Sequence, residues 1–241
     1  MENLKLDLLA FAAHPDDVEL SAAGTLMKHK YLGYKVGIID LTQGELGSRG
    51  TIATRYEEAA EAAKIMQLDY RGNLQMADGF FEENEENLRA IITEIRRFKP
   101  DLVLANAIHD RHPDHGRGSS LVSRASFLAG LRKIVTMWDG EVQEAHRPRA
   151  VYHYIQDRFI EPDVVVDVSD FVEQKIEAIK AYKTQFWDPK SAEPATPISG
   201  ADFFDFIRGR MKEMGRPIGA AYAEGFTAER FLGVDDLFLL K

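Results

Sequence analysis

Two short polar segments hold most of the residues in this chain that could do chemistry, His14-Pro15-Asp16-Asp17 and His112-Pro113-Asp114-His115. Two histidines and a carboxylate, with a fourth position open to water, form a typical catalytic zinc site. Once two histidines and one of Asp16-Asp17 are assigned as ligands, one histidine and the other aspartate remain besides Asp114, and hydrolysis also needs a base for the water and a group to stabilise the oxyanion. Spacing alone leaves open which aspartate of Asp16-Asp17 binds the metal, and Asp114 could orient a histidine.

The composition of this 241-residue chain limits the kinds of site that it can form, its cellular location and its partners. Cysteine is absent, which excludes disulfides, thiolate metal sites and cysteine nucleophiles, so a metal would need nitrogen and oxygen ligands. The formal net charge of -9 opposes nonspecific binding to nucleic acid. No apolar run approaches the roughly 18 residues of a membrane helix, and the N-terminus lacks a signal-peptide pattern. We therefore expect a cytoplasmic protein with no nucleic-acid or membrane partner.

Apolar runs and amphipathic stretches alternate along the chain and predict strands and helices in turn. We expect strands at 6–13, 35–41, 70–74, 101–105, 150–155 and 164–168. We expect helices at 20–32, 54–66, 84–98, 116–131, 170–182 and 202–214. Thr54 with Glu57, and Asp170 with Glu173, have the spacing of capping boxes. Residues 190–200 are rich in proline, serine and alanine and are expected to form a loop.

This alternation predicts an α/β fold of Rossmann-like type, with a mostly parallel sheet and helices on both faces. The pattern is clearest over the first ~135 residues, and no break or repeat divides the rest, so we expect one domain over 1–241. If the strand order is the common 3-2-1-4-5, the first and fourth strands are neighbours at the switch point where such sheets bind ligands. The two polar segments follow those strands and would then converge.

Three less specific interpretations compete with a metal-dependent hydrolase. Each tetrapeptide taken alone could be a solvated turn, since aspartate and proline favour turns. Histidine- and aspartate-rich loops also serve phosphoesterases, which usually hold two metals. A non-catalytic metabolite-binding module of Rossmann type is a third possibility, but the chain lacks the glycine fingerprint of that fold.

The motifs AHPDD after the first strand and HPDH after the fourth resemble those of the LmbE-like (PIG-L) zinc-dependent N-deacetylases. The resemblance covers nearly the whole chain. The segments GTIATRYEEAAEAAKIM, DRHPDH, AYKTQF and AYAEGF are similar to the branch of the family that deacetylates N-acetylglucosaminyl malate in bacillithiol biosynthesis. The resemblance therefore implies a zinc-dependent amide hydrolase that acts on a small-molecule amino sugar.

Carried over to this chain, the resemblance makes His14, Asp17 and His115 the metal ligands and Asp16 the general base. His112 becomes the oxyanion stabiliser and an acid. Zinc is the family's usual metal, although two histidines and one carboxylate also suit ferrous iron. Relatives in this branch form homo-oligomers, often hexamers, and we expect an oligomer here, to which the apolar C-terminal residues LFLL could contribute.

Four further assignments follow from the motifs and their resemblance. Asp114 is expected to orient His112 and to favour its imidazolium form. Arg55 matches a pocket arginine of the family and is expected to contact the substrate, as a guanidinium suits a malyl carboxylate. The glycine-rich segment 43–50 is open to either a sugar contact or a surface connection. Residues 222–226 are assigned no more than a pocket-wall or subunit-contact role.

Overall fold

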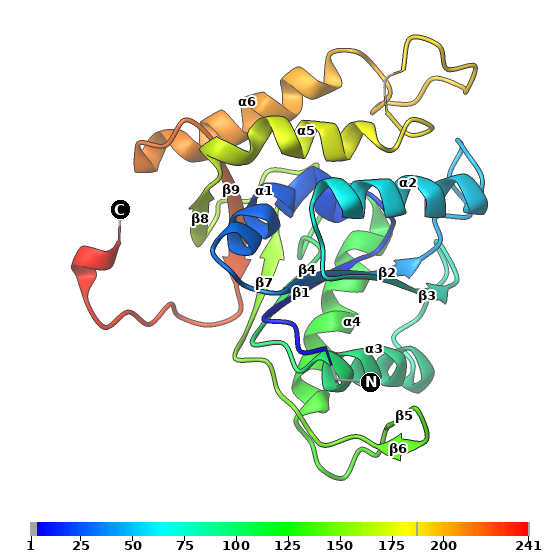
Figure 1. The fold of residues 1–241 in the computed structure, drawn as a ribbon, viewed down its shortest axis with the longest axis vertical. Helices are drawn as coiled ribbons and strands as arrows, with labels where there is room; N and C mark the ends of the chain where they lie inside the picture. The colour runs from blue at the N-terminus through cyan, green and yellow to red at the C-terminus, as the bar shows by residue number, and fades with distance from the viewer. Residues whose placement is uncertain (1–3, 187, 241) are drawn as a thin grey trace.

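The computed structural model describes residues 4–186 and 188–240 and is built around one seven-stranded sheet in the order β3-β2-β1-β4-β7-β9-β8 (Figure 1). The strands that run parallel to one another are β1 (Leu8–Ala12), β2 (Val36–Thr42), β3 (Tyr70–Met76), β4 (Leu102–Ala105) and β7 (Ala150–Tyr154). Their order is the 3-2-1-4-5 that the sequence analysis assumed. The α/β fold with a mostly parallel sheet is confirmed.

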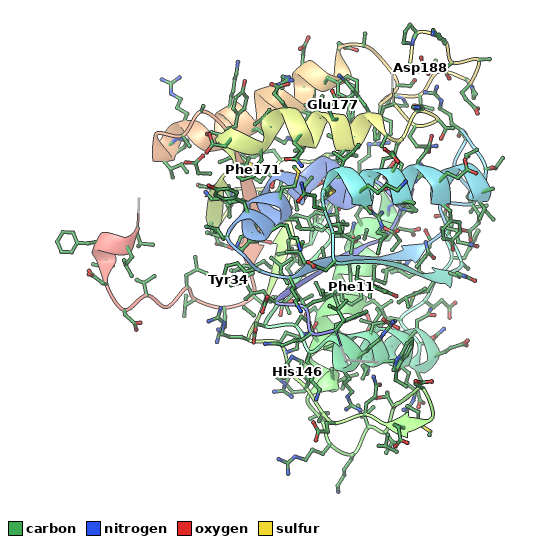
Figure 2. The ribbon with its side chains drawn as sticks, in the orientation of Figure 1. Phe11, Tyr34, His146, Phe171, Glu177 and Asp188 are labelled. Carbon is green, nitrogen blue, oxygen red and sulfur yellow. The ribbon has the colours of Figure 1, made fainter. Side chains whose placement is uncertain are left out.

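The central strands have continuous apolar sequences because they are buried on both faces. Every residue of β1 and β2 is buried, because helices cover both faces of a parallel sheet. Phe11 lies at the centre of the molecule, in the core that the sheet forms with two helices below it (Figure 2). At about 25 cal/mol per Å² of buried apolar surface, such side chains stabilise the fold by roughly 2 kcal/mol each.

Helices lie on both faces of the sheet, as predicted. One face is covered by α3 (Glu85–Phe98) and α4 (Pro113–Ala129), which pack against each other. The other face is covered by α1 (Asp17–Tyr31) and α2 (Ile52–Ile65); α5 (Val172–Lys180) packs over these two helices, and α6 (Phe203–Gly215) lies beside α5 (Figure 1). Buried residues of α2, α5 and α6 form one cluster, so α6 is anchored over this second face.

The far edge of the sheet departs from the sequence prediction. β9 (Ala223–Ala228) lies between β7 and β8 (Val164–Asp167) and runs antiparallel to both. The segment 222–226 is therefore mostly an interior strand. It does not line the main cavity described below, but Ala223, Glu224 and Gly225 line a second cavity of about 20 Å³. A short hairpin of β5 (Met137–Trp138) and β6 (Glu141–Val142) was also not predicted.

Four helices begin two or three residues away from their predicted starts. α1 begins at Asp17 and not at 20, and local hydrogen bonds or residue types account for the other three. α2 begins at Ile52 because Thr51 and Thr54 form a reciprocal capping box, in place of Thr54 with Glu57. α4 begins at Pro113, since proline suits the first position of a helix. Before α5 a short 3₁₀ turn, Ser169–Phe171, replaces the predicted cap at Asp170. Segment 190–200 is a loop, as predicted.

Candidate metal centre

The two polar segments meet at the carboxyl ends of β1 and β4. The ring centroids of His14 and His115 are 5.6 Å apart, and the His112 ring lies 4.6 Å from His14 and 5.2 Å from His115. One nitrogen from each ring can be chosen so that the three lie within 4.8 Å of one another. The predicted convergence of the two segments is confirmed, and its cause is the neighbouring position of β1 and β4 in the sheet.

Asp16 precedes α1 in an unusual backbone conformation. Its φ is 114°, a region that few residues other than glycine adopt and that clusters at functional sites. Although Asp16 holds the cap position of α1, its side chain makes no capping hydrogen bond, and it lines the main cavity instead. The turn therefore directs the Asp16 carboxylate away from the helix that it introduces.

Asp17 is held in place from three directions. Its carboxylate accepts hydrogen bonds from the His14 backbone N–H at 2.9 Å, from Asn106 Nδ2 at 3.0 Å and from Gln156 Nε2 at 3.1 Å. Burial opposes ionisation, but the neighbouring His115 and His14 rings outweigh it and hold the pKa of Asp17 well below its usual range. Asp17 is therefore a fixed, ionised carboxylate.

Each of the two histidines beside Asp17 is oriented by a second carboxylate. His115 Nδ1 lies 2.5 Å from Asp110 Oδ2, while its Nε2 lies 3.1 Å from Asp17 Oδ1. His14 Nε2 lies 3.0 Å from Asp78 Oδ1, while its Nδ1 lies 3.6 Å from Asp17 Oδ2. Metal-binding histidines in proteins usually have such a partner on the nitrogen that does not face the metal.

The charge around these rings favours a cation. Burial would lower the pKa of both histidines, but the carboxylates raise it, to about 9 for His115 and well above the usual value for His14. In the metal-free protein, protons on the rings balance the carboxylates. A divalent ion can replace those protons, so the donor set of His14, Asp17 and His115 fits the zinc or ferrous ion predicted from the sequence.

His112 and Asp114 are arranged differently from the prediction. The Asp114 carboxylate accepts from the Gly79 N–H and from Arg117, both at 2.8 Å, and does not pair with the His112 ring. The backbone N–H of Asp114 donates to His112 Nδ1 at 3.3 Å instead. Burial and the nearby His14 and His115 rings lower the pKa of His112. The ring is therefore neutral near pH 7, with its proton on Nε2, which corrects the expected imidazolium.

Arg55 faces Asp16 and its turn. Arg55 is buried, its Nη1 lies 3.4 Å from Asp16 Oδ2, and its Nη2 donates a short hydrogen bond to the Pro15 carbonyl. Burial raises the pKa of Asp16 to about 7, although the Arg55 cation opposes that rise. These contacts make Arg55 a residue that positions the Pro15-Asp16 turn, and its predicted contact with substrate stays a prediction.

A cavity of about 310 Å³ opens over this cluster and has two walls of different composition. The metal wall consists of His14, Asp16, Asp17, His112 and His115. The α6 wall consists of Ile198, Phe203, Phe206, Ile207 and Arg210. The α6 wall belongs to the loop before α6 and to that helix, and sequence analysis assigned it no role.

The structure also shows supporting residues that sequence analysis missed. Asp110 and Asn106 lie in the loop between β4 and α4, Asp78 follows β3, and Gln156 follows β7. Their shared position after parallel strands was the available signal, because the carboxyl ends of such strands gather at one edge. The segment 43–50 contacts one of them, because the Leu46 N–H donates to Asp78; Arg49 of the same segment binds Ser191 and the Gln185 carbonyl.

Comparisons with known proteins identify a family and several similar chains. The model of the PIG-L family, described as GlcNAc-PI de-N-acetylase, matches residues 9–126. Diacetylchitobiose deacetylase of Thermococcus kodakarensis is 28% identical over 199 residues, covering 76% of this chain and 73% of that protein. A probable N-acetyl-alpha-D-glucosaminyl L-malate deacetylase 2 of Bacillus subtilis is 28% identical over 199 residues, covering 76% and 84%. The crystal structure of conserved protein TT1542 from Thermus thermophilus superposes with a TM-score of 0.85 at 36% identity, covering 95% and 98%.

Proposed function

This chain belongs to the PIG-L (LmbE-like) family, and from that membership we propose that it is a metal-dependent hydrolase that removes the N-acetyl group from an N-acetylglucosamine conjugate. The substrate that we propose is N-acetylglucosaminyl malate, on the resemblance of the motifs and the similarity to the Bacillus subtilis protein. The observation that carries the proposal is that Asp17 lies between the His14 and His115 rings in one cavity, beside Asp16, whose side chain makes no capping hydrogen bond.

His14, Asp17 and His115 would hold the ion, with zinc as the first choice. A bound divalent ion lowers the pKa of a nearby water and polarises a carbonyl oxygen. Asp16 takes the proton of the attacking water, and its pKa of about 7 in the metal-free site suits a base that works near neutral pH. The water oxygen bonds to the acetyl carbon.

His112 stabilises the oxygen that becomes negative during this attack. Its neutral ring carries the proton on Nε2, because Nδ1 accepts the Asp114 N–H, and a fixed donor of this kind contributes about 3 kcal/mol of transition-state stabilisation. The C–N bond then breaks, and Asp16 returns the proton to the leaving nitrogen. Acetate and a free amine are the products.

The direct test measures amine and acetate release from N-acetylglucosaminyl malate and from N-acetylglucosamine, with and without a chelator. We expect release from the malate conjugate that stops on chelation and returns with zinc or ferrous iron. Release that survives complete removal of metal would overturn the mechanism. A metal-to-protein ratio near two, with phosphate-ester cleavage and no amine release, would favour the phosphoesterase alternative instead.

We also propose that the protein is a homo-oligomer held partly by its C-terminal segment. Residues 230–240 lead away from the body of the molecule, and several of their apolar side chains are exposed, Phe231 and Phe238 almost completely (Figure 1). Burying such side chains against a second copy would lower the free energy. We expect light scattering to show an oligomer for the full chain and a smaller species for a chain ending at Glu229. Equal masses would contradict this assignment.

No helix in the described ranges 4–186 and 188–240 has the length and apolar character to cross a bilayer. The expected cytoplasmic location and the absence of nucleic-acid partners stay predictions.

A further inference from the structure

Three arginines line the cavity, and their partners differ. Arg55 lies against Asp16 at 3.4 Å, and Arg111 pairs with the Asp157 carboxylate at 3.0 Å. Arg210 on α6 forms no ion pair within the described ranges 4–186 and 188–240; its Nη2 donates to the Asp157 backbone carbonyl at 2.5 Å. Arg210 is therefore the cavity arginine whose charge no carboxylate balances at close range.

Two of the acidic groups near Arg210 are committed elsewhere, and the third, Glu213, is an exposed residue of α6 itself. The Asp157 carboxylate binds Arg111, and the Asp110 carboxylate binds His115 and the Arg158 N–H. Arg210 is half-buried, and burial lowers its pKa, because removing a cation from water is costly unless an anion compensates. A ligand that brings an anion to this point of the cavity would supply the missing partner.

The surroundings of Arg210 keep its guanidinium near a fixed position. The hydrogen bond to the Asp157 carbonyl holds one end of the guanidinium, and the Cζ atom of Arg210 lies 4.8 Å from the centre of the Phe206 ring. Both contacts leave other N–H donors of the planar group available. A guanidinium held in this way can form paired hydrogen bonds to a carboxylate or a phosphate.

We propose that Arg210 binds an anionic group, a carboxylate or a phosphate, on the part of the substrate attached to the N-acetylated sugar. This inference rests on the proposed deacetylase function, because it places the acetamide at the metal wall and the attached group at the α6 wall. Arg210 then determines specificity: it selects conjugates that carry an anion over neutral glycosides, and it acts through binding of the substrate.

The test compares three substrates in the full-length, metal-loaded protein: N-acetylglucosaminyl malate, N-acetylglucosamine 1-phosphate and the neutral methyl N-acetylglucosaminide. For Arg210→Gln we expect kcat/KM for the preferred anionic substrate, relative to the neutral one, to fall about tenfold or more, mainly through KM. The substrate that shows the largest fall identifies the anion as a carboxylate or a phosphate. Arg210→Lys should recover part of the ratio, since it keeps the charge without the planar group.

Arg208→Gln is the matched control. Arg208 lies on the same helix, but its guanidinium binds Glu173 at 2.7 and 2.8 Å on the outer surface, so its loss should leave all three rates unchanged. A thermal melt of each variant separates misfolding from lost binding. If Arg210→Gln folds poorly, inhibition of the wild type and of Arg210→Lys by free malate and by phosphate gives the same information through their inhibition constants.

The two hypotheses fail in distinguishable ways. Wild-type protein that releases no amine from any of the three substrates would overturn the proposed function. Wild-type protein that is active, but whose anionic-to-neutral ratio is the same in Arg210→Gln, would overturn the role of Arg210 and leave the deacetylase proposal standing.

Discussion

The metal wall and the α6 wall face the same cavity but are built in opposite ways. On the metal wall each ligand is fixed by several partners: Asp17 accepts three hydrogen bonds, and His14 and His115 each contact a second carboxylate. On the α6 wall apolar side chains surround an arginine held through one backbone carbonyl. The metal wall is therefore a rigid cluster, whereas the α6 wall has few polar constraints. On the proposed function, the first would carry out the reaction and the second would select among substrates.

Removing a proposed metal ligand from the metal wall should have the largest effect on activity. We expect Asp17→Ala to lose bound metal and to reduce amine release about 10³-fold or more, because two histidines alone are a poor site for the ion. Metal analysis beside kcat/KM checks this. Asp157→Ala, which alters a carboxylate of the cavity rim, is the control and should keep its metal. Full metal content in Asp17→Ala would show that another set of residues binds the ion.

Changing Asp16 should separate chemistry from metal binding. We expect Asp16→Asn to keep its metal and to lose about 10²- to 10⁴-fold in kcat, the usual contribution of a general base. Metal content and kcat are measured on the same sample. Loss of metal along with activity would make Asp16 a ligand and reverse the assignment of the two neighbouring aspartates.

The apparent affinity of the metal wall for its ion should depend on pH. Because the pKa of His115 is raised to about 9, a metal must displace a proton from this ring at any lower pH. Apparent affinity should fall about tenfold per pH unit for each proton displaced, and so about 100-fold for one proton between pH 8 and pH 6. Titration with a competing chelator at several pH values checks this. An affinity independent of pH would contradict the raised pKa.

The proton on His115 weakens metal binding, but it stabilises the fold of the metal-free protein. A histidine whose pKa is higher in the folded than in the unfolded state stabilises the fold below the unfolded value of about 6.5, and this contribution disappears as the pH rises through the folded value. For His115 the window is therefore from about 6.5 to about 9. Thermal melts of the metal-free protein should show this loss, which Asp17→Ala should reduce.

Altering a supporting carboxylate should have a smaller effect than altering a ligand. We expect Asp110→Asn to weaken metal affinity about 10- to 100-fold, since an amide orients His115 less strongly than a carboxylate. Competition for zinc with a chelator of known affinity measures the change. Asp163→Asn, whose carboxylate accepts the Ala228 N–H at the surface, is a suitable control. An unchanged affinity would mean that packing alone orients the ring.

On the α6 wall, single apolar changes should have the smallest effect. Phe206 is 44% exposed and lines the cavity, so Phe206→Ala removes contact area without leaving a buried polar group unsatisfied. We expect KM to rise about three- to tenfold, and kcat to change little, because the contact is made equally in the ground and transition states. Steady-state kinetics check this. A fall in kcat as large as that of Asp16→Asn would show that α6 takes part in the chemistry.

Much of this fold follows from local patterns in the sequence. The buried runs at β1, β2 and β4, and the alternation with helices, predict the parallel sheet, because these patterns depend on burial and short connections. The strand order was only assumed, as the common order of such sheets. Asp139-Gly140 also signalled the turn of the β5–β6 hairpin, which was overlooked; both residues have the positive φ that such turns need. β9 was missed since its pairing partners are far away in the sequence.

Residue types and their spacing were sufficient to identify the available chemistry: two histidine- and aspartate-rich segments, no cysteine, and strands that precede those segments. How these groups are arranged in space depends on the packing of the whole fold. Asp78, Asp110, Asn106 and Gln156 support the ligands from other loops, and α6 brings Arg210 over the cavity. The reason is physical: residue type and spacing fix local geometry, but contacts between distant segments depend on how the buried faces of sheet and helices pack together.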